Sequence, residues 1–114
     1  MPYLKIVTNL ALPTDSRATL LARASKTLAQ QLGKPERYVM AEASGDTALL
    51  FGGSDAPAAY VELKSIGLDI SQTKSLSKTI SELLHAELNI APDRVYIEFI
   101  NIQGNCWGWN GGTF

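Results

Sequence analysis

The sequence has few residues of the kinds that build disulfides and metal sites. Its 114 residues include one cysteine, Cys106, and one histidine, His85. A single cysteine excludes an intramolecular disulfide and a multi-cysteine zinc site, and a single histidine excludes a histidine-rich metal centre. We therefore expect a protein that works without a metal or any other cofactor.

Two further absences concern the partners of the chain. The 10 lysines and arginines nearly balance the 11 aspartates and glutamates, so no basic excess points to nucleic acid. No stretch approaches the ~18 apolar residues that a membrane span needs, and the N-terminus lacks the pattern of a secretory signal. These absences predict a cytoplasmic protein that binds neither nucleic acid nor a membrane, with non-classical export left open.

The sequence does contain an internal repeat. Lys34-Pro35-Glu36-Arg37 matches Ala91-Pro92-Asp93-Arg94, and the two prolines lie 57 positions apart, which is half of 114. Upstream of each proline, apolar residues recur at every fourth position, as on one face of an amphipathic helix. They are Leu20, Ala24, Leu28 and Leu32 in the first half and Leu76, Ile80, Leu84 and Leu88 in the second.

Signals around these two helices complete the expected fold. Polar residues at 14–16 and 71–73 suit helix starts, and Gly33 and Asn89 suit helix ends. Segments 3–8, 38–42, 60–65 and 95–100 have the composition of strands. We predict one α/β domain over 1–114, built from two β-α-β halves at about 1–57 and 58–114. A four-stranded mixed sheet would carry both helices on one face, as a two-layer sandwich.

Several segments remain outside this repeat. The tail from Gln103 is rich in glycine yet aromatic, so we expect it to pack onto the domain. Phe51-Gly52-Gly53-Ser54 is typical of a turn, with an anion-binding backbone nest as the weaker alternative. We interpret His85 as an ordinary helix residue and Cys106 as a small apolar filler.

The first residues carry one chemical signal. Pro2 follows Met1, and a small second residue permits removal of the initiator methionine. The chain would then begin with a secondary amine, whereas ordinary α-amines titrate near pH 7.7–8.0. Burial in an apolar pocket lowers such a pKa, which would make the amine a general base near neutral pH. By itself a Met-Pro start is common and carries little weight.

Taken together, these features resemble the macrophage migration inhibitory factor family of the tautomerase superfamily, over essentially the full chain. The residues that carry the resemblance are Pro2, Thr8-Asn9, Gly33-Lys34-Pro35, Tyr38, Phe51-Gly52-Gly53-Ser54, Ser65-Ile66-Gly67, Pro92-Asp93-Arg94-Val95-Tyr96-Ile97, Gly108-Trp109-Asn110 and Thr113-Phe114. The resemblance implies a homotrimer whose sheets surround a central channel. It also implies keto–enol tautomerisation of phenylpyruvate-type arylpyruvates, with dopachrome as a test substrate and no cofactor.

The resemblance further implies a role for each matched residue. Pro2 would be the catalytic acid/base, Lys34 would bind the substrate carboxylate, and the Ile66 backbone N–H would contact the substrate. Tyr96 would come from the neighbouring subunit as a wall, and an aromatic rim would hold the ring. The rim residues are Tyr38, Trp109 and Phe114. Without the resemblance, Lys34 is also explained as a cation at a helix C-terminus.

The chain departs from the family pattern at four positions. Glu98 stands where vertebrate members carry an asparagine that contacts a para-hydroxyl group, so the preference between hydroxylated and plain rings is open. Trp107 replaces a smaller residue and would narrow the pocket mouth. Ala58 and Val61 occupy the positions of a Cys-x-x-Cys pair, which excludes thiol–disulfide oxidoreductase activity. The alternative function is a cytokine-like protein that binds a cell-surface receptor, with a vestigial or modulatory pocket.

Overall fold

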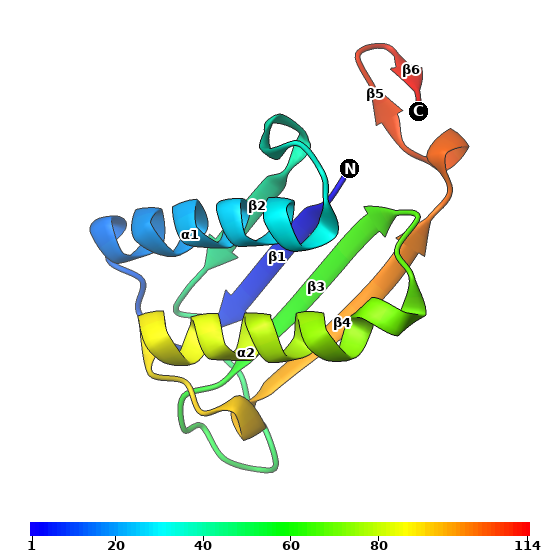
Figure 1. Cartoon of the computed structure of the whole chain (residues 1–114). Helices are drawn as coiled ribbons and strands as arrows, with labels where there is room; N and C mark the ends of the chain where they lie inside the picture. The colour runs from blue at the N-terminus through cyan, green and yellow to red at the C-terminus, as the bar shows by residue number, and fades with distance from the viewer.

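The computed structural model describes residues 1–114 and consists of a four-stranded sheet with two helices on one face (Figure 1). The main elements are β1 (Tyr3–Thr8), α1 (Thr14–Leu32), β2 (Met40–Ser44), β3 (Ala59–Ile66), α2 (Thr73–Leu88) and β4 (Val95–Ile102). The strand order is β2-β1-β3-β4, parallel within each half and antiparallel where β1 meets β3. The predicted pair of β-α-β units and the mixed sheet are therefore confirmed.

The core lies between the sheet and the helices. Alternate residues of β1 and β3 are buried, because successive strand side chains point to opposite faces and one face is covered. The helices contribute the stripes expected from the four-residue spacing, of which Leu20, Leu28, Leu76 and Leu84 are fully buried. Neither helix combines the length and apolarity that crossing a bilayer requires.

The predicted helix ends are confirmed, and both helices begin within the predicted polar segments, at Thr14 and Thr73, but the side chains of these segments do not cap them. Gly33 and Asn89 end the helices in left-handed conformation, with φ of 65° and 55°. At the start of α1, Pro13 holds the capping position, and no side chain caps the helix. Before α2 a short 3₁₀ turn intervenes, and the Asp69 carboxylate accepts a hydrogen bond from the Ser71 N–H within it at 2.9 Å.

One strand begins later than expected. β2 starts at Met40, because residues 36–38 form a 3₁₀ turn directly after Pro35. In this turn the Tyr38 N–H donates to the Pro35 carbonyl at 3.1 Å. The turn carries the Tyr38 side chain off the sheet and toward the C-terminal tail, where its ring meets that of Trp109.

The tail folds onto the domain as expected. After a 3₁₀ turn at Gly104–Cys106, β5 (Gly108–Trp109) and β6 (Gly112–Thr113) form a small hairpin near the chain N-terminus (Figure 1). The interpretation of Cys106 as an apolar filler is wrong, because its side chain is exposed to solvent. His85 is an exposed residue of the last turn of α2, as expected.

Candidate functional site

Pro2 is buried directly before β1, beside a cavity of about 260 Å³. Its carbonyl accepts a hydrogen bond from the Met40 N–H at 3.0 Å, which ties the N-terminal segment to β2. The residues that line the cavity are Met1, Pro2, Tyr3, Arg37, Tyr38, Val39, Met40, Trp107, Gly108, Trp109 and Phe114. The cavity thus joins the chain terminus to the aromatic tail.

Three aromatic rings form one side of this cavity. Trp109 and Phe114 stack with their ring centres 5.4 Å apart, and Tyr38 meets both edge-on at 5.5 and 6.0 Å. Offset and edge-to-face contacts of this kind favour aromatic packing beyond simple burial. Trp109 nevertheless remains 52% exposed, so its ring has surface left for a further partner.

Lys34 lies just beyond the left-handed end of α1 and points toward the end of β3. Its ammonium nitrogen, Nζ, donates to the Ile66 carbonyl oxygen at 3.3 Å. Burial and the nearby Lys34 charge lower the pKa of the Met1 amino group below its ordinary value of 8.0. The structure therefore brings Lys34, Ile66 and the N-terminal segment together, although Lys34 and Ile66 do not line the 260 Å³ cavity.

Tyr96 and Glu98 lie elsewhere on the sheet. Tyr96 pairs with Tyr60 in β3, and Tyr60 pairs with Val7 near the far end of β1 from Pro2. The Tyr96 side chain is 66% exposed, and its ring packs against Phe51 at 4.5 Å between ring centres. Within one chain, neither Tyr96 nor Glu98 lines the cavity beside Pro2.

The Phe51–Ser54 segment is a turn, as the sequence favours. Phe51 and Ser54 exchange backbone hydrogen bonds of 3.0 and 3.1 Å, and the two glycines between them have positive φ. The Arg94 guanidinium binds the turn and the residues after it, donating to four carbonyl oxygens at 2.7–3.2 Å. These belong to Phe51, Ser54, Ala56 and Pro57.

Sequence reasoning missed this role of Arg94. An arginine lies two positions after each proline of the repeat. Arg37, the counterpart in the first half, is exposed and lies over the Tyr38 ring instead of binding carbonyls. Arg94 also stacks over the Phe51 ring, whose other contact is Tyr96. The repeated arginine was a signal for a structural role, but only the loop that surrounds Arg94 supplies its acceptors.

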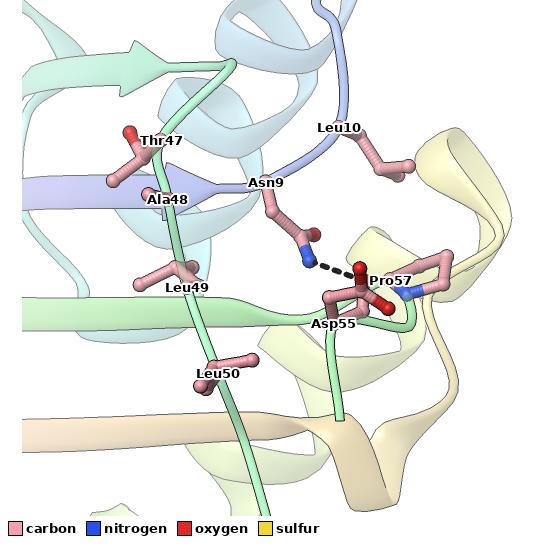
Figure 2. Close-up of a pocket in the computed structure, with 8 residues that line it drawn as sticks. All are labelled: Asn9, Leu10, Thr47, Ala48, Leu49, Leu50, Asp55 and Pro57. Atoms are coloured by element: carbon pink, nitrogen blue, oxygen red, sulfur yellow. Dashed lines mark hydrogen bonds between the residues drawn. The ribbon is translucent and has the colours of Figure 1, made fainter. Parts of the chain in front are cut away.

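A cavity of about 750 Å³ lies at the other end of β1, beside the 47–50 segment (Figure 2). Asn9 closes one side of it, because its amide donates to the Asp55 and Ala56 carbonyls, both at 3.0 Å. Its oxygen accepts from the Ala58 N–H at 3.0 Å. Asp55 is the one titratable side chain in the lining, so no acid–base pair is available there.

Residues 1–114 match the family model described as macrophage migration inhibitory factor (MIF). A macrophage migration inhibitory factor homolog from Brugia malayi is 42% identical, over 100% of this chain and 99% of the relative. The macrophage migration inhibitory factor of Xenopus tropicalis is 39% identical, over 100% of this chain and 99% of the relative.

The solved structures agree with the sequence comparison. The crystal structure of a macrophage migration inhibitory factor homologue from Prochlorococcus marinus has a TM-score of 0.94 and 39% identity, covering 98% of each chain. The structure of the protein from Trichinella spiralis has a TM-score of 0.90 and 35% identity, over 98% of this chain and 99% of that one.

Proposed function

Because the chain belongs to the macrophage migration inhibitory factor family, we propose that it is a keto–enol tautomerase of phenylpyruvate-type arylpyruvates. Dopachrome is a further test substrate. One observation carries the proposal: Pro2 is buried beside an aromatic cavity, and the charge of Lys34, which has no carboxylate partner, acts on the N-terminal amine. A base, a cation and a place for an aromatic ring are the three features that this reaction needs.

Pro2 acts as the acid/base once Met1 has been removed. With Met1 attached, the Pro2 nitrogen belongs to a peptide bond and has no basic lone pair. After removal, the secondary amine takes a proton from the carbon beside the substrate carbonyl. The C–H electron pair forms the C=C bond of the enol, and the carbonyl oxygen receives the proton. The reaction needs no cofactor.

The environment of the N-terminus favours the neutral form of the amine over the charged form. Burial and the Lys34 charge lower the pKa of the Met1 amino group, and the same two causes act on a terminal Pro2. A base with a pKa near the working pH combines the correct protonation state with sufficient basicity. Lys34 binds the substrate carboxylate beside the Ile66 backbone, and Tyr38, Trp109 and Phe114 hold the ring.

We further propose that the site is completed by a second copy of the chain in a homotrimer. Tyr96 is a large aromatic residue that one chain leaves mostly exposed, at the far end of the sheet from Pro2. An exposed aromatic group of this size is typical of an interface. In the assembly, Tyr96 and Glu98 of one subunit would complete the pocket at Pro2 of its neighbour, with Trp107 at the mouth.

The decisive experiment compares the native chain with Pro2→Ala and Pro2→Gly, using phenylpyruvate and borate to trap the enol. Intact-mass spectrometry first establishes that Met1 is absent from all three proteins, and circular dichroism that they fold alike. We expect kcat/KM to fall about 10²- to 10⁴-fold, the usual contribution of a positioned acid/base. Undiminished turnover in either variant would contradict the mechanism.

A further inference from the structure

The turn between β5 and β6 consists of two residues, Asn110 and Gly111. Trp109 pairs with Gly112 across it, and both turn residues have positive φ, of 51° and 77°. Positive φ at both positions is the feature of the type I′ turn, for which Asn-Gly is strongly preferred. Asn110 is exposed to solvent, and a Cβ atom built on Gly111 would have open space around it. Nothing in the chain therefore shields the link between these two residues from water.

The backbone N–H of Gly111 is a second feature of this turn, because it donates no hydrogen bond within the chain. The side-chain amide carbon of an asparagine and the backbone nitrogen of the next residue can close a five-membered ring. A glycine opposes this closure least, since it has no side chain and adopts the widest range of conformations. Asn110 is the one asparagine in the sequence that precedes a glycine. The turn thus holds an electrophilic carbon and a free nitrogen one residue apart.

The four other asparagines lack this combination. In three of them the N–H of the next residue is already a donor, to Thr8 Oγ1 at 3.2 Å, the Leu84 carbonyl at 3.5 Å and the Gln103 carbonyl at 2.9 Å. These three are Asn9, Asn89 and Asn105. At Asn101 the side-chain oxygen accepts a hydrogen bond from the Leu68 N–H at 3.0 Å, which holds the amide in place. Each of these groups must lose a hydrogen bond before a ring can close.

We propose that Asn110 is a site of spontaneous deamidation and that the product alters the aromatic side of the cavity beside Pro2. The Gly111 nitrogen attacks Asn110 Cγ, a C–N bond forms, and the Cγ–Nδ2 bond breaks. Ammonia leaves with the proton that the Gly111 nitrogen gives up, and the ring that remains is a succinimide. Water then opens this ring at either carbonyl, which gives aspartate or isoaspartate. The step needs no co-reactant except water, and nothing is oxidised or reduced.

Local opening of the hairpin makes this reaction accessible in the folded protein. Ring closure turns the Asn110 backbone away from the left-handed conformation of the turn, so the hairpin must open first. β5 and β6 have two residues each, and a two-stranded hairpin is at best marginally stable by itself. Opening such a segment costs much less free energy than unfolding the domain.

The two products differ in their effect on the hairpin. Aspartate leaves the length of the main chain unchanged, and Asp-Gly also favours a type I′ turn. Isoaspartate routes the main chain through the former side chain and adds one atom to a two-residue turn. Trp109 directly precedes this turn and stacks on Phe114 at 5.4 Å, and both rings line the cavity beside Pro2. Isoaspartate therefore displaces this wall. Its effect on the substrate rests on the proposed function, whereas the modification itself does not.

The first measurement incubates the native protein at physiological temperature and pH, then maps its peptides by mass spectrometry together with an isoaspartate assay. The amide-to-acid mass shift should appear at Asn110 earlier and in greater amount than at Asn89, which is also exposed and left-handed. Asn110→Gly is the matched variant, because Gly-Gly suits the same turn and has no side-chain amide. Its tail peptide should show no mass shift. An unmodified Asn110, or equal modification at Asn89, would overturn the site.

The second measurement separates the isoaspartate form by ion exchange and compares it with fresh protein. KM for phenylpyruvate should rise about 2- to 10-fold, the value of one displaced aromatic contact, with kcat little changed. Fresh Asn110→Asp and incubated Asn110→Gly should keep the KM of fresh native protein.

An isoaspartate form with the KM of fresh protein, or an equal rise in incubated Asn110→Gly, would overturn the effect on the cavity. An equal rise in fresh Asn110→Asp would overturn the role given to chain length. If the native protein shows no turnover, the proposed function fails, whereas tryptophan fluorescence still decides this inference. An unchanged spectrum in the isoaspartate form would overturn the displacement of Trp109.

Discussion

The two β-α-β halves are alike in packing and unlike in chemistry. Leu28 and Leu84 occupy equivalent places on the two helices, and both are buried against the same sheet. Lys34, however, corresponds to Ala91, so only the first half has a cation at this position. The comparison teaches that a repeat preserves the apolar pattern that makes a core, while single substitutions outside the core restrict a site to one copy.

The largest expected effect tests whether the two helices pack equally well against the sheet. Leu28→Ala and Leu84→Ala should each lower the free energy of unfolding by about 2–5 kcal/mol, since each leaves a cavity in a packed interior. The two losses should agree to within about 1 kcal/mol if the halves pack equivalently. Urea unfolding followed by circular dichroism measures both, and a much larger difference would break the comparison.

The two repeated arginines, Arg94 and Arg37, should contribute unequally to the free energy of unfolding. Arg94→Ala removes four hydrogen bonds from a charged donor, one of them part-buried, and should cost about 1–3 kcal/mol. Arg37→Ala, on an exposed turn, should cost less than about 0.5 kcal/mol. The same unfolding experiment compares them, and equal losses would refute the role given to Arg94.

Lys34→Ala tests the chemical difference between the halves. We expect kcat/KM for phenylpyruvate to fall about 10- to 100-fold, as a charge-assisted hydrogen bond is lost. The acid limb of the kcat/KM–pH profile should move to higher pH, because Lys34 helps to lower the pKa of the terminal amine. Ala91→Lys, the matched change in the second half, should alter neither quantity. An acid limb that stays in place would separate Lys34 from the base.

The smallest effect concerns two buried hydroxyls at equivalent places on β1 and β3. Thr8 donates to the Ala58 carbonyl at 2.7 Å and accepts from the Leu10 N–H, so Thr8→Val should cost about 1–2 kcal/mol. Ser65 has no partner, so Ser65→Ala should raise the free energy of unfolding by about 1 kcal/mol. Thermal unfolding of the two variants should show opposite shifts in Tm, and shifts of the same sign would contradict this difference.

Much of the fold could be predicted because its signals are local. The four-residue spacing before Pro35 and Pro92 identified both helices, and the alternation in residues 3–8 and 60–65 identified two central strands. The start of β2 was misjudged, because a 3₁₀ turn after Pro35 uses residues with strand-like composition. Cys106 was misjudged as well, since a small apolar residue has no pattern that distinguishes a core position from a surface turn.

Part of the candidate site could likewise be predicted from the sequence, and part could not. The sequence by itself determined the tandem fold, the absence of paired cysteines and the presence of a proline directly after Met1, because these depend on residue identity and short-range spacing. The tertiary structure alone decided that Pro2 is buried and that the Lys34 ammonium group donates to the Ile66 carbonyl. Such contacts join residues far apart in the chain, and their distances depend on strand register and packing, which no single segment encodes.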